Sequence, residues 1–505
     1  MKDSPDEIVR EIRRLVDAQD WDGLVPLTEK YVQRVGLARP DVWPEVFAAF
    51  PREWLLAHPR QRYFAAVYQA VTGRYSVPDG EELAEYARWV ESQEHPLPRD
   101  TILLEASRLQ YVRLLGLFDE APAVLERIER LTVEADDYRG LDDIMPSVYI
   151  PMGTTRLFLG DVRGAISAFA EARRWSSIGP PHPAYDHASN YLALALHLSG
   201  DPVLAASVQA PWAGRRRHPM GSYAYVYEGA SLMLPAFAAL ARLDAEGLER
   251  AIGGFDAGID DDELWWVAAH LRARHALYWG DPAVAAERLE HLLDEKAVMA
   301  PPRTLIRTVL LADLSDLYQA QGDLHRAVDA HREPSVEHPL AVLSRARLQM
   351  LLGDAPAARA LLPVDAPDGL PRATAPGSWL ALRAALDRVS DDDDADRFAV
   401  AAAAAVRRRG DLQAIMEADP RTRELIIGSG IVAKDLPDRP YAAGGFRLTD
   451  REIEVLSALR VHESVKATAE ALFLSVNTVK SHLRTVYRKL GVRTREEALR
   501  RAGLQ

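Results

Sequence analysis

A short turn motif, Gly-Asp-x-x-x-Ala, recurs through the middle of this 505-residue chain. When a weaker form at Leu243 is counted, successive copies lie 31 to 43 residues apart, which is about the length of one pair of antiparallel helices. Such a period favours an array of helical hairpins. The full copies are Gly160–Ala165, Gly200–Ala205, Gly280–Ala285, Gly322–Ala327 and Gly353–Ala358.

Each residue type in the motif has a physical role between two helices. Glycine adopts the left-handed conformation that ends one helix, and the aspartate accepts backbone N–H groups at the start of the next. Pro202 and Pro282 occupy the first helical position, which needs no N–H donor. The alanine lets paired helices approach closely. Apolar residues one turn later, such as Phe169, Leu289 and Leu362, are expected to face the neighbouring helix.

The motif resembles the turn of tetratricopeptide-type arrays, although the fuller signature of that repeat is not regular here. An irregular all-helical domain with similar turns is the alternative. Signals for β-strands are sparse, so we predict an all-α fold. The expected domains are a helical-repeat body over residues 1–427, a Gly- and Pro-rich linker over 428–446, and a compact helical domain over 447–505.

Composition narrows the functional classes. The chain has no cysteine, which excludes disulfides, thiol catalysis and cysteine-ligated zinc. Its first residues are too charged for a secretory signal, and no apolar run is long enough to span a bilayer. We therefore expect a cytoplasmic protein without a membrane partner.

The body is the expected sensor, because solenoids bind partners on their concave surface. Aromatic and basic residues in its middle are the candidates for contact with a small-molecule or protein effector. The competing interpretation is that the aromatic side chains pack between helices and that the basic segment is a solvated loop. The effector candidates are Trp212, Arg216, Tyr225 and Trp266.

The last domain differs from the body in charge. Residues 447–505 carry twelve Lys or Arg and seven Asp or Glu, a net +5, whereas the whole chain carries −13, which leaves −18 on the body. A cationic domain on an acidic body indicates a polyanionic partner. Thr449 and Glu452 form a capping box, so a helix is expected from Asp450, with Ile453, Leu456 and Leu459 as its apolar stripe.

A second short helix is expected over 465–472 and a third over 476–490. Ser475 precedes the third helix, where its hydroxyl can cap the helix or meet a phosphate. One face of this helix is apolar, with Val479, Leu483, Val486 and Leu490. The opposite face presents Asn477, Lys480, Ser481, Arg484 and Arg488. A helix fits the DNA major groove, and long polar side chains reach base edges from there.

The run LTDREIEVLSAL, followed by LFLSVNTVKSHLRTVYRKLGVRTREEAL, closely resembles the LuxR-type helix-turn-helix of bacterial transcriptional regulators. The resemblance implies that Lys480, Ser481 and Arg484 face bases in double-stranded DNA. It implies backbone contacts for Asn477, Thr478, Arg488 and, more weakly, Lys466. In this family the last helix often pairs two copies of the domain. Here that implies a homodimer through Leu499 and Ala502, with packing inside one domain as the alternative.

The sequence departs from the family pattern at two places. His462 stands where the family usually has glycine, and the second helix begins Val-Lys-Ala-Thr-Ala. Both changes affect the first turn and the second helix. The third helix keeps the family pattern, so DNA binding is still expected.

The combination of helical repeats and this domain resembles the larger regulators similar to the maltose-system activator, which also carry an ATPase module. No Gly-x-x-x-x-Gly-Lys-Ser/Thr occurs here, so nucleotide switching is not indicated and no cofactor is expected. The leading hypothesis is a sequence-specific transcription regulator, with RNA polymerase as a further candidate partner. One alternative is an interaction scaffold whose last domain docks protein. Another is a sigma-factor-like module, which the Thr478-Val479-Lys480-x-His482 sequence disfavours.

Enzymatic function is the least favoured class. Histidines are scattered, and His182, Asp186 and His187 form the closest cluster. Nothing else in the sequence fixes a ligand geometry around them, so helix capping or loop polarity is the simpler account. We expect neither a catalytic site nor a metal.

Overall fold

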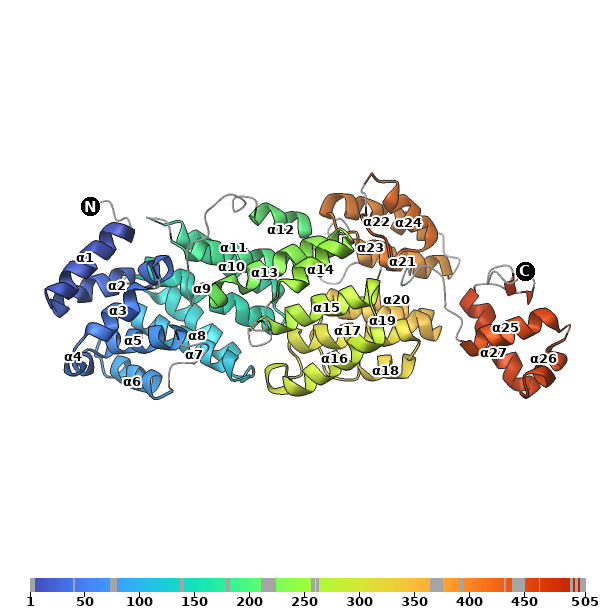
Figure 1. Ribbon diagram of the computed structural model, residues 1–505, viewed down its shortest axis with the longest axis horizontal. Coiled ribbons are helices and arrows are strands. Elements are labelled where there is room, and N and C mark those ends of the chain that lie inside the picture. Colours follow the sequence, from blue (N-terminus) through green and yellow to red (C-terminus); the bar gives the residue numbers. More distant parts are fainter. Residues whose placement is uncertain are drawn as a thin grey trace.

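The computed structural model shows an elongated helical array followed by a small helical domain (Figure 1). Every regular element among the residues that the structure describes is a helix. The described residues are 5–39, 41–72, 80–136, 140–178, 182–209, 224–255, 259, 263–363, 376–389, 394–430, 433–437, 450–462, 464–490, 494–495 and 498–499.

The first helices of the body form a compact group at the amino-terminal end of the array (Figure 1). They share one hydrophobic core with α7, α8 and α9. Their bounds are α1 Pro5–Asp17, α2 Trp21–Ala38, α3 Val42–Ala49, α4 Arg52–Ala57, α5 Pro59–Thr72 and α6 Gly80–Glu91.

From α7 onward the helices form antiparallel pairs, and each odd-numbered helix up to α21 also packs on the next odd-numbered one. This arrangement confirms an all-α array of helical hairpins. A second, larger core runs through it from Phe118 to Ile426. The bounds are α7 Pro98–Leu114, α8 Ala121–Glu134, α9 Leu141–Phe158, α10 Val162–Ser176, α11 Ala184–Leu198, α12 Pro202–Gln209, α13 Ala224–Ala241, α14 Ala245–Gly253, α15 Trp265–Trp279, α16 Pro282–Glu295, the 3₁₀ helix η4 Ala297–Met299, α17 Leu305–Gln321, α18 Leu324–Asp329, α19 Pro339–Leu352, α20 Ala355–Leu361, α21 Gly377–Val389, α22 Ala395–Arg409, α23 Ala414–Glu417 and α24 Pro420–Ile427.

The repeated turns follow the prediction at four of the five sites. Their glycines have positive φ, their alanines are fully buried, and each aspartate accepts a backbone N–H of the next helix. These sites are Gly160 to Ala165, Gly200 to Ala205, Gly322 to Ala327 and Gly353 to Ala358.

The turn at Gly280 differs from the prediction. Its φ is −111°, so it does not use the left-handed conformation. Asp281 still caps α16 by accepting N–H groups of residues 283 and 284. The alanine of the motif, Ala285, is only half-buried, and the small residue at the helix contact is Ala286, which is 2 % exposed. At this turn, the altered glycine conformation is accompanied by a shift of the buried alanine from the fifth to the sixth position after the glycine.

The end of the array returns to its middle, because α22 packs against α12. The Leu412 N–H donates to the Ala241 carbonyl at 2.7 Å. Arg409 Nη1 donates to the Gly200 carbonyl at 3.4 Å. Helices α11, α13, α15, α19 and α21 consequently contribute to one pocket, lined on a further side by residues 411–417.

Part of the predicted linker is bound to the body. The Asp435 N–H donates to the Leu243 carbonyl at 3.0 Å, and its Oδ2 accepts the Ala245 N–H at 3.2 Å. Trp279 Nε1 donates to the Asp435 carbonyl at 3.2 Å, and Lys434 Nζ lies 3.0 Å from Asp244 Oδ1. Residues 433–437 therefore belong to the body, and residues 438–449 connect them to α25.

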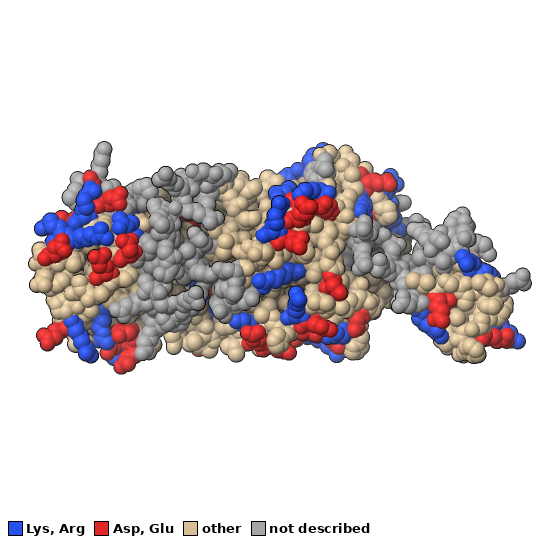
Figure 2. All heavy atoms as spheres, viewed as in Figure 1, with Lys and Arg blue, Asp and Glu red and all other residues tan. Residues whose placement is uncertain are grey.

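Side chains of both charge signs stand next to one another on the described surface seen in Figure 2. The negative charge of the body is thus spread among basic side chains on this face. None of the described helices combines the length and the apolar character needed to cross a membrane.

Candidate nucleic-acid interface

The last domain is built from three described helices that pack on one another, α25 Asp450–Val461, α26 Val465–Ala471 and α27 Val476–Leu490. The third helix has the predicted bounds, and the second ends one residue earlier than predicted. Thr449, which the predicted capping box requires, lies outside the described residues.

The small core of the domain confirms most of the predicted apolar faces. Val479, Leu483 and Val486 of α27 are at most 5 % exposed. The prediction was wrong about Ile453, which is 43 % exposed, because the buried stripe of α25 instead runs through Val455, Leu456 and Leu459. The side chain of Leu490 lies outside the described residues.

Two serines start the second and third helices. Ser464 Oγ accepts the Ala467 N–H at 3.2 Å. Ser475 Oγ accepts the Thr478 N–H at 3.0 Å and lies 2.7 Å from Thr478 Oγ1. Ser475 therefore caps α27, and its exposed position at the helix amino terminus also suits contact with a phosphate.

The face of α27 opposite the core is polar and open to solvent. Asn477, Lys480, Ser481 and Arg484 are exposed, and Thr478 is half-buried. Neither Lys480 nor Arg484 forms an ion pair with a residue that the structure describes. Because residues four apart share one side of a helix, the two cations form a short basic row beside the hydroxyl and amide groups.

The remaining predicted contacts are only partly described. Lys466 is exposed on α26. Leu499 is half-buried and packs against the core of its own domain. The side chain of Arg488 and all of Ala502 lie outside the described residues.

The structure assigns Arg495 a positioning role that the sequence did not reveal. Its Nη2 donates to the carbonyls of Leu459 at 2.7 Å and His462 at 3.1 Å. These carbonyls lie at the end of α25, where backbone acceptors lack helical partners. Arg495 thus holds the turn in which His462 replaces the usual glycine. In the sequence, the only sign of this role is the presence of an arginine after the third helix.

The turn between α26 and α27 contains an unusual aromatic residue. Phe473 is 97 % exposed and has a φ of 54°. A left-handed conformation is costly for a residue with a bulky side chain. Sequence reasoning did not single out Phe473, because an exposed phenylalanine has no periodic pattern to mark it.

Of the four effector residues predicted for the body, the structure describes the side chain of only one. Trp266 is 0 % exposed and packs edge-on against Phe158, so the structure corrects its assignment to a binding surface. Trp212 and Arg216 lie outside the described residues, as does the side chain of Tyr225. The misassignment of Trp266 has a simple cause, since a large aromatic side chain fills helix interfaces as well as grooves.

The histidine cluster of the body has structural contacts. His182 Nδ1 accepts the Ala184 N–H at 3.1 Å, and Nε2 lies 3.0 Å from the Asp143 carbonyl. Burial lowers the pKa of His182 to about 4 and that of His187 to about 3. The neutral imidazole of His182 therefore caps α11 and joins it to α9.

Residues 447–502 match the luxR family of bacterial regulatory proteins. The chain is also similar to the probable csgAB operon transcriptional regulatory protein of Salmonella typhimurium and to the CsgBAC operon transcriptional regulatory protein of Escherichia coli. Each is 44 % identical over 52 residues, which is 10 % of this chain and 24 % of the relative. The chain therefore spans about a quarter of the length of these relatives, and the likeness supports a DNA-binding domain of the luxR type at 447–502.

Proposed function

We propose that this protein is a sequence-specific transcription regulator in which α27 enters the DNA major groove. The observation that carries the proposal is the exposed row of Lys480, Ser481 and Arg484 on a helix whose opposite face is buried. In a luxR-type domain this face is the one available to DNA. Arginine and lysine provide the contacts that read guanine.

The neighbouring polar groups suit contacts to the DNA backbone. Asn477, Thr478, Arg488 and Lys466 are proposed to bind phosphates, with Ser475 at the amino terminus of α27 beside them. Such contacts fix the register of the helix without reading sequence. Leu499 and Ala502 are proposed to pair two copies of the domain, which would give a palindromic target site. RNA polymerase remains a candidate partner of the bound dimer.

The body, residues 1–427 together with the bound segment 433–437, is proposed to sense an effector and to control the domain at 447–505. The support is the attachment of residues 433–437 to helices α13 to α15. A change in those helices would reach the connection that positions the DNA-binding domain.

Selection of DNA from a random pool tests the proposal. The full chain is compared with a Lys480→Ala/Arg484→Ala variant at two salt concentrations, because phosphate contacts make affinity depend on salt. The matched control is Arg451→Ala/Arg460→Ala, which removes the same charge from α25. We expect the wild type and the control variant to enrich a palindromic site, and the α27 variant to enrich none.

A selection that enriches no site with either the full chain or residues 440–505 would instead favour a domain that docks protein. Equal enrichment by the wild type and the α27 variant would reject α27 as the reading helix. The two results separate a wrong function from a wrong interface.

A further inference from the structure

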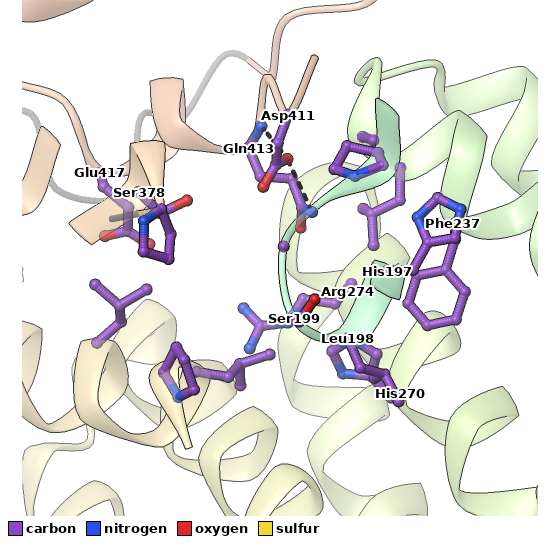
Figure 3. A pocket seen from close by; sticks show the side chains of 18 of the residues that line it. His197, Leu198, Ser199, Phe237, His270, Arg274, Ser378, Asp411, Gln413 and Glu417 are labelled. Carbon is purple, nitrogen blue, oxygen red and sulfur yellow. Dashed lines mark hydrogen bonds between the residues drawn. The ribbon is translucent and has the colours of Figure 1, made fainter. Parts of the chain in front are cut away.

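A pocket lies where the end of the array folds back onto its middle. Its volume is ≈ 110 Å³. Since a protein cavity of about 150 Å³ holds benzene, this one suits a ligand of about four or five non-hydrogen atoms. Figure 3 shows Glu417 and Ser378 on the opposite side of the pocket from Phe237 and His197, with Arg274 between them.

A series of buried ion pairs lies next to this pocket. Arg274 Nη2 lies 2.8 Å from Asp313 Oδ1, and its Nη1 donates to Asp316 Oδ2 at 2.9 Å. Arg347 Nη2 lies 2.6 Å from Asp316 Oδ1, and its Nη1 donates to Glu417 Oε1 at 2.5 Å. All five side chains belong to residues that are at most 7 % exposed. Three carboxylates therefore share two guanidinium groups.

Two of the three imidazoles that line the pocket carry no positive charge at pH 7. Burial lowers the pKa of His197 and that of His338 to about 4, so both are neutral at pH 7. His270 Nδ1 lies 2.7 Å from Asp313 Oδ2 and is already engaged there. His197 stacks on Phe237 with ring centroids 5.2 Å apart. The pocket thus offers an apolar aromatic wall. Its two arginines are paired with carboxylates, although Arg274 Nε lacks an acceptor among the described residues.

Two carboxyl groups in the wall each have an oxygen that accepts no hydrogen bond from a described residue. Glu417 is 7 % exposed, and its Oε2 has no hydrogen-bond partner among the described residues. Asp411 Oδ1 accepts two N–H groups of Gln413, at 3.1 and 3.3 Å, and no bond from a described residue reaches its Oδ2. Burial raises the pKa of Glu417 above its ordinary value and that of Asp411 to about 6. Both ionised carboxylates therefore lack full compensation.

We propose that this pocket binds a small organic cation with one or two ammonium groups, which the carboxylates of Asp411 and Glu417 receive. Asp313, Asp316 and Glu417 share the two guanidinium groups of Arg274 and Arg347, and Asp411 has Arg409 nearby. The ligand would add positive charge between Glu417 and Asp411. A metal ion is a different chemistry, and the described residues include no group of three or more His, Asp or Glu side chains placed to hold one.

This inference rests on the proposed function, because it identifies the effector site of the regulator. The pocket adjoins the elements that hold residues 433–437. Tyr278 lines the pocket, and the next residue, Trp279, donates to the Asp435 carbonyl. Ala241 also lines it, and Leu243, two residues later, accepts the Asp435 N–H. A ligand that shifts α13 or α15 would change the hold on residues 433–437.

Titration calorimetry on the full chain tests the site directly. The probes are butylamine and 1,4-diaminobutane, and the matched controls are butan-1-ol and butyrate, which have similar size but neutral or negative charge. We expect at least one amine to bind with a Kd of about 1 mM or tighter and both controls to bind at least about tenfold more weakly. Absence of binding by both amines, or tighter binding of butyrate, would overturn the proposal.

Variants locate the binding. Asp411→Asn and Glu417→Gln should each weaken the amine about tenfold or more, which corresponds to one lost charged contact. Glu295→Gln, an exposed position on α16, should leave the affinity unchanged. Thermal unfolding checks each variant. If the Glu417→Gln variant does not fold, the Asp411→Asn variant alone tests the site. We expect this variant to fold, because Asp411 makes no ion pair within hydrogen-bond distance to a described residue. Unchanged affinity in a folded Asp411→Asn variant rejects the site.

A second readout separates this inference from the proposed function. The amine that binds is added to the full chain together with the selected DNA, and a shift of at least about threefold in DNA affinity supports an effector role. If the chain binds an amine but selects no DNA, the proposed binding site stands and the proposed regulatory function is rejected. Intact DNA binding with no amine binding would reject the site and keep the regulator.

Discussion

The body and the DNA-binding domain use charged side chains in opposite ways. The body buries them in pairs, such as Arg274 with Asp316 and Arg347 with Glu417, all at most 7 % exposed. In the last domain the described cations of α27 are exposed and point away from a small apolar core. Buried charges hold distant helices in register, whereas exposed charges are available to a partner.

The difference also separates local from long-range organisation. Arg347 and Glu417 are 70 positions apart in the sequence and meet only because the array curves back on itself. The polar face of α27 needs only fifteen consecutive residues. Perturbations should therefore affect the two regions independently.

The largest expected effect is acid unfolding of the body. A histidine whose pKa is lowered on folding binds fewer protons in the folded state, so stability is lost as the pH falls from about 6.5 toward the folded pKa. One such group contributes about 3 kcal/mol over this window. Burial lowers the pKa to about 4 or below for His182, His187, His197, His331 and His338.

Three buried carboxyls oppose this trend without reversing it. Burial raises the pKa of Asp143 to about 7, that of Asp411 to about 6 and that of Glu417 above its ordinary value, so their contribution to stability is present at low pH and is lost as the pH rises through the raised pKa values. Five histidines against three carboxyls leave a net loss of several kcal/mol between about pH 6.5 and 4. All ten tryptophans lie in the body, so their fluorescence in urea titrations reports it alone. A urea midpoint that stays constant across this window contradicts the account.

Leu483→Ala should unfold the last domain without affecting the body. The side chain is 5 % exposed in the core, and its removal costs about 2–5 kcal/mol. Calorimetry should show a lower transition for this domain, while tryptophan fluorescence of the body stays unchanged. Val461→Ala is the control, because Val461 is 70 % exposed and its loss should change stability by less than about 0.5 kcal/mol. A shift in the tryptophan transition would show that the two regions unfold together.

Arg495→Ala tests the turn that contains His462. The change removes charged hydrogen bonds to two carbonyls at the end of α25, which are worth about 1.5–3 kcal/mol. We expect lower thermal stability of the last domain and weaker DNA binding that cooling partly restores. Arg495→Lys should recover part of the loss. Equal stability of wild type and the alanine variant would mean that the carbonyls are satisfied without Arg495.

The smallest expected effect concerns the segment bound to the body. Asp435→Ala removes the side-chain acceptor of the Ala245 N–H, a loss of about 1 kcal/mol. Limited proteolysis followed by mass spectrometry should detect faster cleavage within 433–437. Lys434→Ala, which removes an exposed ammonium group, should have a smaller effect. Cleavage at the wild-type rate in the Asp435 variant would argue that its backbone contacts alone hold the segment.

The local features of the molecule could be predicted from the sequence. Gly160 and Asp161 end one helix and start the next through contacts within four residues, and the face of Val479 and Leu483 follows from helical periodicity. The error at Ile453 was also local, since both candidate stripes of α25 have helical spacing. Here the packing of α27 decided which stripe is buried.

The pocket could not be predicted. Its lining runs from His197 to Glu417, and its closure depends on the summed rotation of successive hairpins, which no local pattern encodes. In the sequence, nothing distinguishes Asp411 and Glu417 from other polar residues near the end of the body. Likewise, the role of Asp435 depends on where α13 and α15 end, so a Gly- and Pro-rich composition indicated only a linker.

The most direct test of the central claim is the affinity of the full chain for its selected duplex and for a scrambled duplex, measured against salt. We expect Lys480→Ala/Arg484→Ala to lower the affinity for the selected duplex by about 30-fold or more and to abolish nearly all of the preference over the scrambled duplex. Arg451→Ala/Arg460→Ala should keep that preference. If the two double variants lose equal affinity and both retain the preference, α27 does not read the DNA sequence.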